Sequence, residues 1–182
     1  PIIESYLDKI VPGEGTYVSA KPAERRITFS PYVFSVPEDH VELDLVAIMM
    51  PFAMDFDATY KAIKGSCKDA GLRPLRADDI WEESTVVQDI FNLIFRAQVV
   101  IVDFTGKNSN VMYETGIAHT LGKHVVPIAQ SLDDVPFDMR HHRVLRYLPN
   151  AEGLLKLRTK LAEKLKQVGV AGRKQDEDDP GF

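Results

Sequence analysis

The sequence has little of several features that define large classes of proteins. It holds one cysteine, Cys67, in 182 residues, which excludes an internal disulfide and favours a reducing compartment. The formal net charge is −5, whereas binding nucleic-acid polymers usually needs a basic excess, so we expect no such partner. The longest apolar run, around Val46–Met54, is far too short to span a bilayer, and no basic-then-apolar leader opens the chain. We therefore expect a cytoplasmic protein without a membrane partner.

The remaining composition is that of a globular chain with one sizeable core. Hydrophobic residues make up 45% and charged residues 27%. Residues 1–42, rich in proline, serine and charge, predict an N-terminal arm with edge strands at Arg26–Phe29 and Tyr32–Val36. Residues 43–168 predict a single α/β domain, and residues 169–182, which include an acidic run, predict a disordered tail.

Apolar runs alternate with amphipathic ones in the predicted domain. The expected strands are Leu43–Met50, Leu72–Leu75, Val99–Phe104, Val125–Ala129 and Val144–Tyr147. Four helices are expected. The first is Asp57–Ala70, which ends at Gly71, and the third is Asn110–Leu121, which ends at Gly122. The second begins at the cap Ser84 and turns Val87, Ile90, Phe91 and Ile94 inward, and the fourth covers residues 151–168. This alternation is typical of a doubly wound parallel sheet of about five strands, in which ligands bind beyond the carboxyl ends of the strands.

The segment from Asp103 to His119 is the strongest candidate for chemistry. A buried strand ends in Asp103, a polar loop follows, and Glu114 comes early in the next helix. There the positive end of the helix dipole favours an ionised carboxylate, which can act as a nucleophile or an electrostatic stabiliser. The alternative is that Glu114 only complements the helix dipole. Gly116 leaves room for a sugar or a neighbouring backbone to come close.

Other polar and aromatic residues follow the first two strands. Asp89 is either a solvated helix carboxylate or one of two carboxylates that converge on a glycosidic bond. Arg76 and Trp81 are candidates to hold a phosphate and to stack on a base, or else belong to an Asp-rich turn with a packed tryptophan. Phe52 either lines a base pocket or belongs to the core.

Several conventional sites are missing from the sequence. It has no Walker-type loop, no Rossmann glycine triplet after the first strand and no nucleophile elbow. His141 and His142 with Asp138 form the one cluster that resembles metal ligands, but adjacent side chains point in different directions. We therefore expect neither a metal nor a cofactor. Cys67 is expected to be a core or surface thiol, and His119 to pack on its helix beside Ala118.

Six segments together resemble the nucleoside 2-deoxyribosyltransferase-like superfamily, whose relatives include nucleotide N-glycosidases and, distantly, NAD-cleaving TIR-like domains. They are Val46–Phe52, residues 70–72, Arg76–Ile80, Asp89–Ile90, Val102–Gly106 and Asn108–Lys123, within residues 43–150. The most specific is Asn-Val-Met-Tyr-Glu-Thr-Gly-Ile-Ala-His at 110–119.

The resemblance implies a flavodoxin-like sheet and a crevice for a nucleoside or nucleotide. It implies that Glu114 attacks the anomeric carbon and that Asp89 assists protonation of the leaving base. It also implies a homo-oligomer in which a neighbouring subunit completes the pocket. The residues expected to bind substrate are Pro51, Phe52, Asp78, Trp81, Asp103, Thr105, Asn108, Asn110 and Tyr113.

The sequence departs from the superfamily pattern at two places. The transferases usually show Gly-Pro after the first strand, where this chain has Met50-Pro51, and many members place Asp and Gly where it has Asn108-Ser-Asn110. The prediction is therefore cleavage or transfer at an N-glycosidic bond, with a nucleotide-sensing module that does no chemistry as the alternative. A flavodoxin-like redox or phospho-acceptor domain is a third hypothesis. Arg76, Arg140 and Arg143 are all candidates to hold a phosphate.

Overall fold

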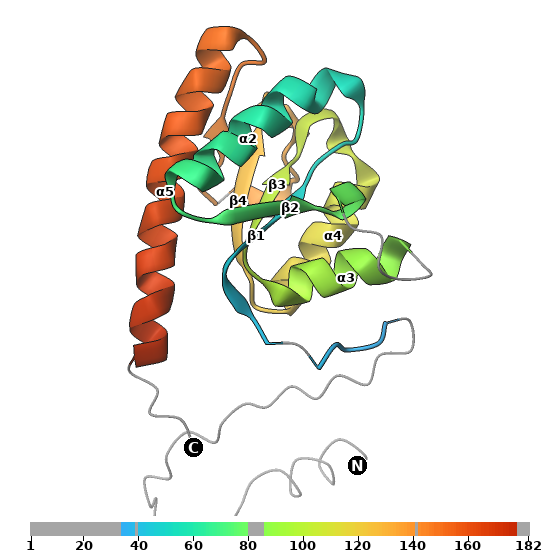
Figure 1. The fold of residues 1–182 in the computed structure, drawn as a ribbon. Coiled ribbons are helices and arrows are strands. Elements are labelled where there is room, and N and C mark those ends of the chain that lie inside the picture. The colour runs from blue at the N-terminus through green and yellow to red at the C-terminus, as the bar shows by residue number, and fades with distance from the viewer. Residues whose placement is uncertain (1–33, 39, 80–85, 141, 178–182) are drawn as a thin grey trace, which may run out of the picture. The chain divides into compact units, whose positions relative to one another are not determined.

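The computed structural model describes residues 34–38, 40–79, 86–140 and 142–177, with side chains described up to residue 168 except that of Asp78. These residues form one five-stranded parallel sheet in the order β2-β1-β3-β4-β5, with helices on both faces (Figure 1). The strands are β1 (Glu42–Met49), β2 (Arg73–Arg76), β3 (Ala97–Asp103), β4 (His124–Ala129) and β5 (Leu145–Arg146). The long helices are α2 (Asp57–Asp69), α3 (Val86–Arg96), α4 (Ser109–Thr120) and α5 (Ala151–Glu177).

The predicted fold class is confirmed, and the sheet is consistent with a flavodoxin-like fold. Each strand and helix expected between residues 43 and 168 is present, and Gly71 and Gly122 follow α2 and α4 with positive φ. Helix α5 continues to Glu177, past the predicted end at residue 168. The predicted strand Tyr32–Val36 is wrong in its described part, because Phe34–Val36 is outside the sheet. The predicted strand Arg26–Phe29 and the expected cap Ser84 lie outside the described residues.

Two apolar layers hold the helices against the sheet. On one face, Val46 and Ile48 of β1 pack in a cluster with residues of α2 and α5. On the other face, Leu45 and Ala47 of the same strand pack in a cluster with residues of α3 and α4. This alternation follows from the period of two residues in a strand, and it explains why strands covered on both faces are continuously apolar.

The strand order fixes where a ligand crevice is expected. The chain leaves β1 through α2 to reach β2 on one side, and returns through α3 to β3 on the other side of β1. In sheets of this kind the crevice lies at that switch point, beyond the carboxyl ends of the two central strands. The segments there are residues 50–56 after β1 and residues 104–108 after β3.

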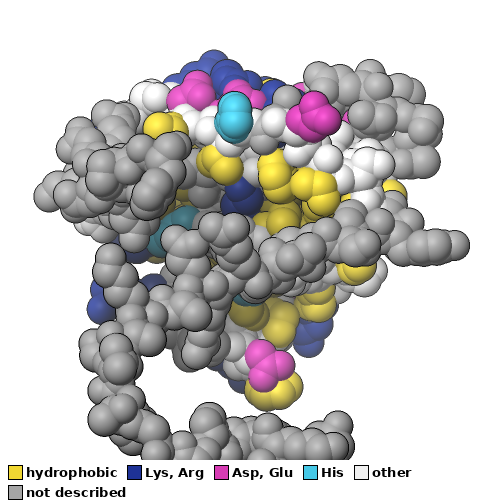
Figure 2. All heavy atoms as spheres, turned by 90° about the horizontal axis from the view of Figure 1, so that it is seen from below, with side chains coloured by type: hydrophobic (Ala, Val, Ile, Leu, Met, Phe, Trp, Pro, Cys, Tyr) yellow, Lys and Arg dark blue, Asp and Glu magenta, His cyan; other side chains and the backbone are white. Residues whose placement is uncertain are grey.

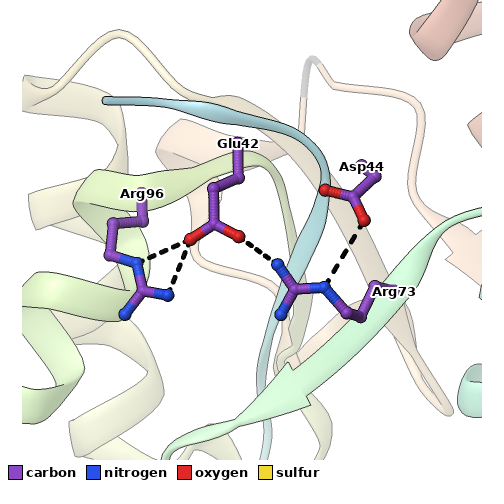
Figure 3. Close-up of polar contacts among 4 residues, drawn as sticks. All are labelled: Glu42, Asp44, Arg73 and Arg96. Atoms are coloured by element: carbon purple, nitrogen blue, oxygen red, sulfur yellow. Dashed lines mark hydrogen bonds and ion pairs between the residues drawn. The ribbon is translucent and has the colours of Figure 1, made fainter. Parts of the chain in front are cut away.

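Ion pairs join three elements at the opposite, amino end of β1. Glu42 accepts from Arg73 of β2 and, at 2.7 Å, from Arg96 at the end of α3, while Arg73 also lies 3.4 Å from Asp44 (Figure 3). All four side chains are partly exposed, so each pair contributes little by itself. Their shared guanidinium and carboxylate groups link β1 to β2 and to the end of α3.

Residues before β1 contact α3. The Phe34 ring stacks on Phe91 with centroids 4.6 Å apart, and the Gln88 amide both accepts from the Ser35 N–H and donates to the Ser35 carbonyl. Val36 remains 44% exposed. Figure 2 shows the molecule from below, with hydrophobic side chains in the middle of that face. The side-chain amide of Gln88 thus bonds the backbone groups of Ser35 that a neighbouring strand would bond if this segment were part of the sheet.

Substitution of Gly153 by alanine is expected to destabilise the protein by about 1–3 kcal/mol, because a Cβ there would lie 2.3 Å from the Leu148 carbonyl oxygen. The matched control is Gly116→Ala in α4, where a Cβ meets no atom within 4 Å and a gain of about 0.5–1 kcal/mol is expected. Urea denaturation of both variants checks this. Equal stability of the two variants would show that α5 does not approach Leu148 as closely as described.

Helix α5 is the longest helix in the described part of the chain, and it is amphipathic. Leu157, Leu161 and Leu165 are buried against the sheet, with lysine and arginine side chains between them. Within the described residues, no helix combines the length and the apolar character that crossing a membrane requires.

Candidate functional site

Asp103, the last residue of β3, anchors the loop beyond the central strands. It is fully buried, and its Oδ1 accepts hydrogen bonds from the Thr105 N–H at 3.0 Å and the Thr105 hydroxyl at 2.5 Å. Its Oδ2 accepts from the Tyr147 hydroxyl at 2.6 Å. Burial raises the pKa of this carboxyl, although the three hydrogen bonds act in the opposite direction. Asp103 therefore holds the loop, and its carboxylate is not directed at solvent.

The same bonds extend to the loop after β4. The Thr105 hydroxyl accepts from the Gln130 N–H at 3.0 Å, and the Gly106 N–H donates to Asp134 at 3.1 Å. Gly106 has a φ of +75°, which an L-residue rarely adopts, so the turn depends on a glycine here. Together these contacts fix the position from which α4 starts.

The Tyr147→Phe substitution tests this arrangement. It leaves Oδ2 of the buried Asp103 carboxyl without its donor, so we expect a loss of about 1–3 kcal/mol in the free energy of unfolding. The control is Tyr113→Phe, which changes a tyrosine that is 56% exposed and should cost no more than about 0.5 kcal/mol. Urea denaturation gives both values. A Tyr147→Phe variant as stable as the control would contradict the anchoring role.

Asn108 begins α4 rather than facing an open crevice. Its side-chain oxygen accepts from the Asn110 N–H at 2.9 Å and from the Val111 N–H at 3.3 Å, which is the geometry of an N-cap. Asn110 and Tyr113 are exposed in the first turns of the helix. Of the residues expected to touch substrate, these two are available to a ligand and Asn108 has a structural role.

Glu114 lies in the second turn of α4 and is only 6% exposed. Its carboxylate makes no hydrogen bond or ion pair with the part of the chain that the structure describes. Burial raises its pKa from 4.5 to about 7. Burial thus opposes the effect of the helix dipole, which favours the ionised form of this carboxyl group.

Asp89 is also buried, in the first turn of α3, with 7% of its surface exposed. The interpretation of this residue as a solvated carboxylate is thus wrong. Helices α3 and α4 pack against each other on the same face of the sheet. Both follow the carboxyl ends of parallel strands, so the two buried carboxyl groups lie near the amino ends of adjacent helices.

Aromatic rings surround Arg76 at the end of β2. Its guanidinium lies 4.0 Å from the centroid of Tyr60 and 5.1 Å from that of Phe52, and the Tyr60 hydroxyl donates to Asp79. Phe52 is 53% exposed, so it is not a core residue. Pro51, just before it, is buried. The stacked guanidinium is held in a fixed orientation.

Some expected site residues fall outside this description. Trp81 is not among the described residues, and of Asp78 only the backbone is described, in a short turn after β2. His141 is likewise outside them. Within the described residues, no three His, Cys, Asp or Glu side chains converge as metal ligands would.

Cys67 and His119 differ in their surroundings. Cys67 is fully buried, and desolvation raises the pKa of its thiol to about 12, so it is an unreactive core residue. His119 is exposed, and its ring lies 5.9 Å from that of His142.

Sequence reasoning missed the residues that support the site from a distance. Tyr147 was expected only as the end of a strand, and Tyr60, Gln130 and Asp134 as parts of a helix and of loops. Their roles come from contacts across long stretches of chain, such as the one between Asp103 and Tyr147, which are 44 positions apart. Gln130 is marked by one local signal, which is that a polar residue directly follows an apolar strand.

Comparisons with known proteins leave the family open. No family model matches the sequence, and no curated protein matches it. Among solved structures, a 2-deoxyribosyltransferase from Leishmania mexicana is similar over 48% of this chain, with 19% identity and a TM-score of 0.43. Rubredoxin oxygen:oxidoreductase from Desulfovibrio gigas is similar over 72%, with 12% identity and a TM-score of 0.48. The chain spans 65% and 37% of the lengths of these two proteins.

Proposed function

We propose that this protein cleaves the N-glycosidic bond of a nucleoside, a nucleotide or an NAD-like dinucleotide, with Glu114 as the nucleophile. The observation that carries the proposal is the state of Glu114. A carboxyl group that is 6% exposed is normally paired, because an unpaired buried charge is costly. Glu114 has no such partner among the described residues, and its pKa is about 7. A group poised near neutrality, at the edge of the sheet where this kind of fold binds ligands, is typical of a catalytic carboxylate.

The chemistry follows from two carboxyl groups near the ends of adjacent helices. An ionised Glu114 oxygen attacks the anomeric carbon, the bond from that carbon to the base nitrogen breaks, and the base leaves with the electron pair. The leaving base takes up a proton from solvent, which Asp89 passes on. Water then attacks the glycosyl ester, which releases the sugar, restores the Glu114 carboxylate and returns one proton to solvent. A second base in place of water would give transfer instead of hydrolysis.

Exposed aromatic residues support a nucleoside as the substrate. Phe52 is 53% exposed after β1, and Tyr113 is 56% exposed next to Glu114 in the chain. Both follow the central strands, and both offer a flat apolar surface to a base. A second copy of the chain would complete the pocket in the homo-oligomer that this proposal includes.

A panel of candidate substrates tests the proposal. Nucleosides, nucleoside monophosphates and NAD are each incubated with the protein, and free base is measured by chromatography. We expect base release from at least one compound. Silence across the panel, while one of these compounds raises the melting temperature, would overturn the enzyme proposal and leave a binding module of the same fold.

A further inference from the structure

A cavity lies away from Glu114. It has a volume of about 600 Å³ and lies between helix α5 and the edge of the sheet formed by the first half of β4. Strand β5 pairs only with Ile128 and Ala129, so within the described residues His124–Pro127 have no strand on that side. The short last strand therefore creates the cavity, whose volume is in the range of small-molecule sites.

Three cations line this cavity. Arg143 lies before β5, and Lys160 and Lys164 lie one turn apart on α5. None of the three makes a hydrogen bond or an ion pair with the residues that the structure describes. Among the described residues of the lining, Glu163 is the one carboxylate. Positive side chains thus outnumber negative ones in this part of the lining, in a chain whose formal net charge is −5.

His124 belongs to the same lining. Its pKa is lowered, first by burial and then by the nearby charge of Lys164. Like charges at i and i+4 of a helix, as at Lys160 and Lys164, also repel each other. An anion in the cavity would relieve this repulsion and offset the charge of Lys164 near His124. The floor beside these cations is apolar, with Val126 and Pro127 buried and Leu145 half-buried.

We propose that this cavity, named here the α5 pocket, binds an organic phosphate of about the size of a nucleoside diphosphate. Arg143, Lys160 and Lys164 would hold the phosphate groups, since guanidinium and ammonium groups form charge-assisted hydrogen bonds with phosphate oxygens. The apolar floor would contact the remainder of the ligand. Because α4 and α5 cover opposite faces of the sheet, the ligand is an effector and not the substrate of Glu114.

Calorimetry on the full chain tests the α5 pocket, with pyrophosphate and ADP as probes and Glu114→Gln as background to prevent turnover. We expect both probes to bind, and the Arg143→Gln, Lys164→Gln double variant to weaken binding at least about tenfold. Glu163→Gln should strengthen binding severalfold, because it removes the one anion in the lining. Lys166→Gln, on the same helix but outside the lining, should leave the affinity unchanged.

Three results would overturn the proposal. The first is that neither probe binds at concentrations up to about 1 mM. The second is that the double variant binds as well as its parent, and the third is that Lys166→Gln weakens binding as much as the double variant does. A further outcome would also overturn the proposal: neither probe binds, and the protein self-associates unless residues 176–182 are removed. The pocket would then be assigned to the acidic tail of a second copy of the chain. None of these outcomes depends on whether the protein releases a base.

Discussion

The Glu114→Gln variant is expected to lose base release, with a rate at least about 10³-fold below that of the wild type. Glutamine has nearly the same shape but cannot supply a carboxylate oxygen to the anomeric carbon. The side chain is 6% exposed, so a nearly isosteric change keeps the packing of α4 on the sheet. Free base measured by chromatography over time gives both rates.

Glu152→Gln is the matched control for this comparison. Glu152 is a glutamate in the first turn of α5, where it is exposed and paired with Lys156. We expect its rate to equal that of the wild type. If both variants are equally active, Glu114 is a structural residue and the nucleophile assignment is wrong.

The same Glu114→Gln variant is expected to gain stability relative to the wild type as the pH rises. The folded protein holds a proton on Glu114 up to a pKa of about 7, whereas the unfolded chain releases it near 4.5. The wild type therefore loses stability as the pH rises through this window, and above it the buried charge is carried in full. Between pH 5 and 8 the loss amounts to about 2.5 kcal/mol.

Urea denaturation at pH 5 and at pH 8 measures this effect. Glutamine does not titrate, so the stability difference between variant and wild type should grow by about 2.5 kcal/mol over this range, whatever the glutamine itself costs. For Glu152→Gln the corresponding difference should stay within about 0.5 kcal/mol. A difference for Glu114→Gln that does not change with pH would mean that the folded protein does not raise the pKa of this group.

The fold could be predicted from the sequence because local signals agree with one another. Buried parallel strands give continuous apolar runs, as in β3, and the glycines after α2 and α4 adopt the positive φ that such positions favour. The prediction of secondary structure was wrong where the local signals in the sequence are weak. The segment Phe34–Val36 resembles an edge strand, but its backbone groups are taken by Gln88 of α3.

The site was predicted less completely, for a physical reason. Spacing along the chain placed Glu114 and Asp89 in their helices, but it did not reveal that both are buried. Burial depends on how α3 and α4 pack, and it raises the pKa of Glu114 to about 7. The support of Asp103 by Tyr147 depends on a pairing between distant strands, which no local pattern encodes.

The most direct test of the central claim is the pH dependence of base release by the wild-type protein. If an ionised Glu114 is the nucleophile, kcat/KM should fall about tenfold for each pH unit below 7, because only the deprotonated fraction reacts. At pH 5 about one molecule in a hundred would then carry the reactive form. A rate that is constant from pH 5 to 8 would contradict the account, since a carboxyl group with a pKa of about 7 cannot then be the attacking group.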